Sequence, residues 1–97
     1  MKEDLTLLLE KVEKKVGKTI ELTSDFEKLA AVFLKDHIHL NATGLRRAWE
    51  HLRGTGKLSK DTLDKIALFV GYQSWEDFQG ALHGEDNGQT NYETEEN

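Results

Sequence analysis

The sequence predicts an all-α fold, a compact orthogonal bundle of five helices with a helix-turn-helix-like arrangement, followed by a disordered acidic tail. Apolar residues recur at spacings of three and four residues along most of the chain, which is the helical period. Serine, asparagine and glycine stand where these helices are expected to begin and end. Proline is absent from all 97 residues, so nothing interrupts a helix. We expect one helical domain over residues 1–83 and a disordered tail over residues 84–97.

The first helix is predicted by one apolar stripe near the N-terminus. The stripe consists of Leu5, Leu8, Leu9, Val12 and Val16. Gly17 follows it, where a left-handed C-terminal cap is expected. The next residues alternate between polar and apolar, which is typical of an extended connector. We expect Ile20 and Leu22 of this connector to pack against the core.

The second helix is predicted to begin at Ser24, because Ser24 and Glu27 have the spacing of a capping box. Its apolar stripe consists of Phe26, Leu29, Ala30, Phe33 and Leu34. We expect the helix to end near His37 and the burial to continue through Ile38 and Leu40.

Three further helices are predicted in the second half of the chain. Their expected N-cap residues are Asn41, Ser59 and Ser74. Asp77 completes a capping-box spacing with the last of these, and Gly54 and Gly71 mark the ends of the third and fourth helices. Their apolar stripes consist of Leu45, Ala48, Trp49 and Leu52, then Leu63, Ile66, Ala67 and Val70, then Trp75, Phe78 and Leu82.

The net charge of −5 belongs to the C-terminal segment. Residues 85–97 contain five carboxylates and no lysine or arginine, whereas residues 1–84 contain 13 cations and 13 anions. The segment has one aromatic residue, Tyr92, and no aliphatic residue, so it cannot bury enough surface to offset the entropy of ordering it. It is either a solvating extension or an autoinhibitory interaction arm.

Several classes of function find no support in the sequence. Without cysteine there are no disulfides and no thiolate metal sites. The charged N-terminus is unlike a signal peptide, and no run of about 20 apolar residues is present, so we expect a cytoplasmic protein without membrane contact. His37 and His39 form the only close histidine pair and are either a metal site or polar residues at a helix end. Gly54-Thr55-Gly56-Lys57 lacks the spacing of a phosphate loop. We expect no metal, no cofactor and no enzymatic activity.

A basic stretch between residues 46 and 60 is the most informative local feature. It contains five cations and one anion, Glu50. On a helix, Arg46 and Arg47 stand opposite the core residues Leu45 and Trp49. Two interpretations stay open: a solvated face with an Arg46–Glu50 pair, or a helix that lies in the major groove of DNA.

Gly44 lies in the first turn of this basic helix. Glycine there costs about 1 kcal/mol relative to alanine. The cost indicates a close approach to the backbone by phosphate or by another helix.

Residues 41–78 resemble the later helices of lambda-repressor-like helix-turn-helix domains. The residues that carry the resemblance are Thr62-Leu63, Ile66-Ala67, Gly71 and the short acidic helix after Ser74. The resemblance implies that Thr43, Gly44, Arg46 and Arg47 occupy a recognition surface.

Residues 5–80 are also similar to a group of small helical modules in uncharacterised bacterial proteins. The shared patterns are Leu45-Arg46-Arg47-x-Trp49 and Gly71-Tyr72-x-Ser74-Trp75-Glu76-Asp77-Phe78. This second resemblance implies no known activity.

The sequence therefore predicts binding of double-stranded DNA through the basic face of the third helix. The expected contact residues are Thr43, Gly44, Arg46, Arg47, Arg53, Lys57 and Lys60. The alternative is a protein-interaction module that docks a partner, or a second copy as a homodimer, through an apolar patch near Tyr72 and Trp75.

Overall fold

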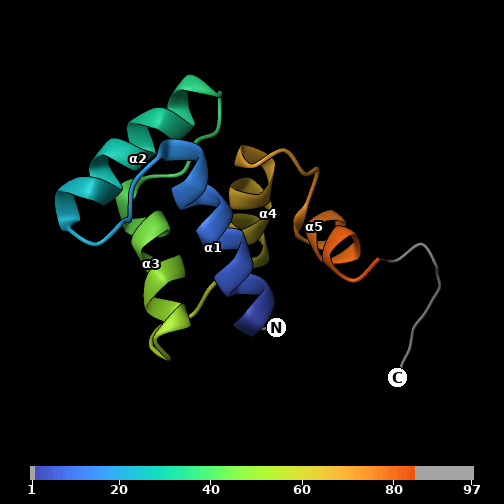
Figure 1. The fold of residues 1–97 in the computed structure, drawn as a ribbon. Coiled ribbons are helices and arrows are strands. Elements are labelled where there is room, and N and C mark those ends of the chain that lie inside the picture. The colour runs from blue at the N-terminus through green and yellow to red at the C-terminus, as the bar shows by residue number, and fades with distance from the viewer. Residues whose placement is uncertain (1, 85–97) are drawn as a thin grey trace.

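In the computed structural model, residues 2–84 form five α-helices, and no strand occurs among these residues. The helices are α1 (Lys2–Val16), α2 (Thr23–Lys35), α3 (Ala42–Leu52), α4 (Lys60–Phe69) and α5 (Trp75–Leu82). Figure 1 shows α1 in the middle, with α2 and α3 on one side and α4 and α5 on the other. The predicted all-α class and the number of helices are confirmed for these residues. The tail predicted over residues 84–97 lies outside the described residues, except for Gly84.

One continuous core joins the helices. Phe33 of α2 stacks on Phe69 of α4, with ring centroids 4.1 Å apart. Phe26 of α2 meets Trp49 of α3 edge to face at 5.4 Å. Such aromatic pairs contribute roughly 0.5–1.5 kcal/mol each beyond the area they bury. The core therefore fixes α2 against both α3 and α4.

The connector between α1 and α2 contains one correct prediction and one error. Gly17 takes the left-handed conformation, with φ at +79°, and ends α1 as predicted. Ile20 is buried, but Leu22 is 65% exposed, so its predicted packing is wrong. Leu22 is the N-cap residue of α2, and its side chain stands outside the bundle where the chain enters the helix.

The start of α2 differs from the predicted Ser24–Glu27 capping box. The Asp25 carboxylate accepts hydrogen bonds from the backbone N–H groups of Glu21 (3.0 Å) and Leu22 (2.9 Å). It also lies 2.7 Å from the Lys18 ammonium. Lys18 first, and then the two backbone donors, hold the pKa of Asp25 well below its ordinary value. Asp25 therefore caps the helix, which begins at Thr23.

The end of α2 lies two residues before the predicted one, at Lys35. His37 then takes a left-handed conformation with φ at +63°, and the Ile38 N–H donates to the Phe33 carbonyl at 3.0 Å. Ile38 is buried as expected. Leu34, predicted in the apolar stripe, is 54% exposed, because a helix turns about 100° per residue and so carries it away from Phe33.

The predicted N-caps of the last three helices are confirmed. The Asn41 side chain accepts from the Gly44 N–H at 2.8 Å. The Ser59 hydroxyl accepts from the Thr62 backbone N–H at 3.2 Å. The Ser74 hydroxyl accepts from Asp77 in the same way, at 3.0 Å. Each bond satisfies a backbone donor that the helix itself cannot.

Candidate nucleic-acid interface

The orientation of α3 is set by its buried face and by one carboxylate of α1. Leu45, Ala48 and Trp49 are buried. Glu13 Oε2 of α1 accepts from the Trp49 indole N–H at 3.4 Å and from the Ile20 backbone N–H at 3.0 Å. One face of α3 is therefore held against the bundle, and the opposite face is open to solvent.

Three of the predicted contact residues, Thr43, Arg46 and Arg47, lie on this open face and are exposed. The Arg46 Nε atom lies 3.5 Å from Glu50 Oε2, and the two side chains are 45% and 42% exposed. An exposed pair at this spacing contributes only about 0.3–0.5 kcal/mol, so Arg46 can leave it for another anion at little cost. Within residues 2–84, Arg47 has no carboxylate partner.

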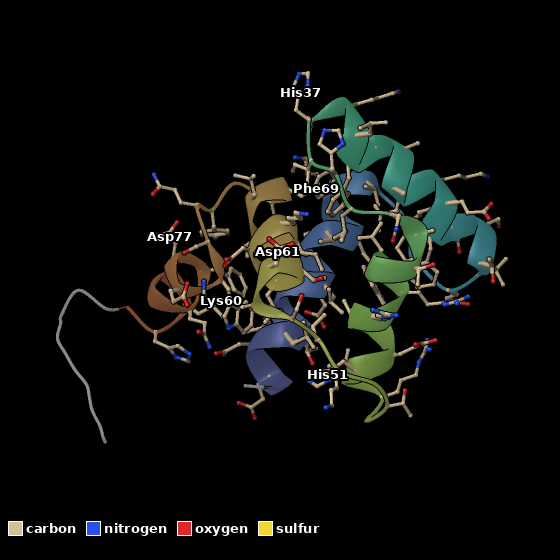
Figure 2. The ribbon with its side chains drawn as sticks, turned by 180° about the vertical axis from the view of Figure 1, so that it is seen from behind. His37, His51, Lys60, Asp61, Phe69 and Asp77 are labelled. Atoms are coloured by element: carbon tan, nitrogen blue, oxygen red, sulfur yellow. The ribbon has the colours of Figure 1, made fainter. Side chains whose placement is uncertain are left out.

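The loop after α3 holds two further cations at the end of the helix. Arg53 is the C-cap residue. Thr55 fixes the loop, because its backbone N–H and its hydroxyl both donate to the Glu50 carbonyl, at 3.1 and 3.0 Å. The His51 ring, labelled in Figure 2, lies 3.1 Å from the Gly56 carbonyl. Arg53 and the next cation, Lys57, are exposed and have no ion pair in the described part of the chain.

Lys60 does not belong to this basic face. Its ammonium lies 3.0 Å from Asp64 on α4 and 3.2 Å from Glu76 on α5, as its place between these helices in Figure 2 shows. Its hydrogen bonds to Asp64 first, and to Glu76 second, raise the pKa of Lys60. The spacing of four residues between Lys60 and Asp64 on a helix was the signal for this pairing in the sequence.

Gly44 has a structural explanation. A Cβ atom at this position would lie 2.8 Å from Leu40 Cδ1 and 3.4 Å from Asn41 Oδ1. The Leu40 side chain, half-buried on the connector, therefore packs over the first turn of α3. The close approach predicted from the sequence exists, but a leucine side chain makes it, whereas we had expected phosphate or another helix.

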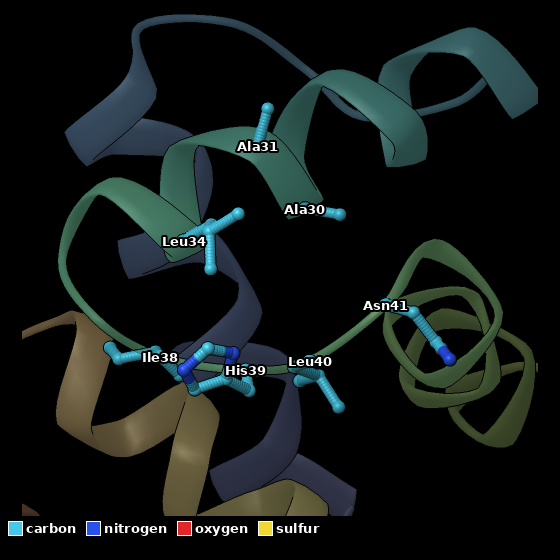
Figure 3. Close-up of a pocket in the computed structure, with 7 residues that line it drawn as sticks. All are labelled: Ala30, Ala31, Leu34, Ile38, His39, Leu40 and Asn41. Atoms are coloured by element: carbon cyan, nitrogen blue, oxygen red, sulfur yellow. The ribbon is translucent and has the colours of Figure 1, made fainter.

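A hollow lies beside the N-terminus of α3. It has a volume of about 430 Å³ and runs between the second half of α2 and the connector, as Figure 3 shows. Its lining residues are Ala30, Ala31, Leu34, Ile38, His39, Leu40 and Asn41. The exposed Leu34 side chain thus stands at the edge of an open, mainly apolar hollow next to the candidate interface.

The connector from α2 to α3 is longer than a helix-turn-helix turn. Six residues, 36–41, separate the two helices, whereas that motif uses three or four. No protein-family model, curated protein or solved structure matches this chain. The resemblance of residues 41–78 to lambda-repressor-like domains stays a prediction.

Of the two aromatic residues expected in an apolar surface patch, Trp75 is buried and Tyr72 is half-buried. Trp75 is 5% exposed, and its backbone N–H donates to Asp64 at 2.8 Å. This bond first, and Lys60 second, lower the pKa of Asp64. Tyr72 is half-buried and lies edge to face on Phe78, with centroids 5.1 Å apart. Both aromatic rings therefore belong to the α4–α5 packing.

No group of three or more histidines, aspartates and glutamates in residues 2–84 could hold a metal ion. No helix among these residues is both long and apolar enough to span a bilayer.

Proposed function

We propose that this domain binds double-stranded DNA through a surface that we name the α3 cationic face. It consists of Arg46, Arg47, Arg53 and Lys57. The observation that supports the proposal is that all four cations are exposed and that three of them have no carboxylate partner in the described residues. Lysine and arginine contacts to phosphate supply most of the affinity in such complexes.

The two ends of the proposed interface, which adds Thr43 to the α3 cationic face, suit different roles. Thr43 and Arg47 lie in the first half of α3, the part of a recognition helix that reaches base edges. Arginine reads guanine through two hydrogen bonds, and the threonine hydroxyl can meet either a base or a phosphate. Arg53 and Lys57 lie at the other end, in the loop that Thr55 fixes, where they would hold phosphates.

The salt dependence of binding tests the proposal. Three or four phosphate contacts give a slope of log affinity against log salt of about −2.7 to −3.6. Between 50 and 200 mM salt, the affinity for a mixed 20-base-pair duplex should then fall roughly 40- to 150-fold. Fluorescence anisotropy with a labelled duplex measures this slope.

A matched pair of variants locates the contact surface. Arg47→Gln should make the slope shallower by about 0.9, because one phosphate or base contact is lost. Lys60→Gln removes the same charge from the α4–α5 side and should leave the slope unchanged. No binding at low salt, or equal effects of the two substitutions, would refute the proposed interface.

A second candidate function, docking of a protein partner or a second copy, is favoured by one observation. Leu34 is 54% exposed at the edge of the 430 Å³ hollow. Sedimentation of the wild-type chain and of Leu34→Ser over a range of concentrations tests self-association. If the wild-type chain stays monomeric over the whole concentration range, the homodimer is refuted.

A further inference from the structure

The segment after the domain and the α3 cationic face carry opposite charges of similar size. The face contains four cations, with Glu50 as the one anion among them. Residues 85–97 contain five carboxylates and no lysine or arginine. On α4, Lys60 and Lys65 already lie within 3.2 Å of carboxylates, so this side of the domain offers no comparable partner for the segment.

The chain leaves the domain at a fixed point. His83, just after α5, lies 3.2 Å from the Asp4 carboxylate, and Gln79 donates to the same carboxylate at 2.9 Å. Burial alone would raise the pKa of Asp4, but the hydrogen bonds from Gln79 and His83 lower it overall. Asp4 is therefore ionised near neutral pH and holds the end of α5 at the start of α1.

This exit point lies within reach of α3. Asp4 and Glu13 are nine residues apart on α1, which is about 14 Å along the helix axis, and Glu13 contacts Trp49 of α3. Figure 1 shows α1 and α3 running in opposite directions, so the C-terminal end of α3 lies at the same end of the bundle as the start of α1. Thirteen residues can span up to roughly 43–47 Å. The length of residues 85–97 is therefore sufficient even for a path around α1.

We propose that residues 85–97 bind the α3 cationic face of their own chain and compete there with DNA. The contact with the α3 cationic face is independent of the proposed function, whereas the competition with DNA rests on it. A short tether gives an effective concentration in the millimolar range, so an intrinsic dissociation constant of about 0.1–1 mM suffices to occupy the face. The attraction between four exposed cations and five carboxylates weakens as salt screens it, so we expect the contact at low salt only.

An experiment without DNA tests the intramolecular contact. The variant keeps the chain length and replaces the five tail carboxylates by amides: Glu85→Gln, Asp86→Asn, Glu93→Gln, Glu95→Gln and Glu96→Gln. Backbone amide shifts of residues 43–57 should differ between this variant and the wild type at 50 mM salt, and the difference should vanish at 500 mM. A chain with the tail residues permuted, at unchanged charge, should match the wild type.

A synthetic peptide of residues 85–97 gives a second measurement. Added to the amide variant, it should shift the same amides of residues 43–57. The proposal is overturned if the backbone amide shifts of residues 43–57 do not change in either experiment. It is also overturned if only residues of other helices shift.

A duplex-binding measurement tests the competition. The amide variant should bind the mixed duplex roughly 2- to 10-fold more tightly than the wild type at 50 mM salt, which follows from the effective concentration and dissociation constant above. If α3 amides shift but neither chain binds DNA, the intramolecular contact stands and the proposed function fails. If both chains bind DNA equally and the amides do not shift, the proposed function stands and the tail contact is overturned.

Discussion

Replacing Glu13 by alanine should loosen α3 and destabilise the whole domain. Glu13 Oε2 accepts from the Ile20 backbone N–H at 3.0 Å and from the Trp49 indole at 3.4 Å. Ile20 and Trp49 are buried, so few other partners can reach these donors. A hydrogen bond to a charged group contributes about 1.5–3 kcal/mol, and a stranded buried donor costs about 1–3 kcal/mol. Since the bond to Trp49 is long, we assign most of the effect to Ile20 and expect a loss of about 2–3 kcal/mol.

Urea unfolding followed by circular dichroism measures this loss as a lower midpoint with an unchanged slope. Glu13→Gln keeps an acceptor oxygen at the same position and should lose less than about 1 kcal/mol. Glu10→Ala, on an exposed position of the same helix, should stay within about 0.5 kcal/mol of the wild type. A Glu13→Ala chain as stable as Glu10→Ala, or Glu13→Gln as unstable as Glu13→Ala, would refute the role assigned to this carboxylate.

Three further substitutions test the packing and the caps. Gly44→Ala should change the unfolding free energy by less than about 1 kcal/mol, because the gain in helix propensity offsets the movement of the flexible Leu40 side chain; thermal melts measure it. Phe33→Ala should cost about 3–5 kcal/mol, since Phe33 is fully buried and stacks on Phe69, and urea unfolding should show it. Asp25→Asn should lower the urea midpoint at pH 7. Because the folded-state pKa of Asp25 is lowered, its stabilisation is present above its ordinary value of 3.8 and is lost as the pH falls through the folded value. The difference between wild type and Asp25→Asn should therefore shrink in titrations below about pH 4.

Local features of the chain were predictable from the sequence. The caps at Asn41, Ser59 and Ser74 depend on bonds to a backbone N–H three residues on, so the residue type and its spacing are enough to find them. The exposure of Arg46 and Arg47 follows equally from the helical period once Leu45 is assigned to the core.

Features that depend on residues outside a single helix were not predictable. Asp25 caps α2 with the help of Lys18, and serine at the next position upstream is the stronger cap signal in a sequence. Trp75 is buried, as its place in the predicted apolar stripe of the last helix indicates, and the alternative expectation that it lies in a surface patch is wrong. The role of Glu13 was not predictable for the same reason, since its two hydrogen-bond partners lie in a connector and in another helix.

The division of α3 into a buried face and a solvent-exposed face has a consequence for its evolution. Thr43, Arg46 and Arg47 bury nothing in the core, so changes at these positions should alter stability by no more than about 0.5 kcal/mol. The outer side of this helix can therefore diverge from one descendant protein to the next while the scaffold beneath stays the same.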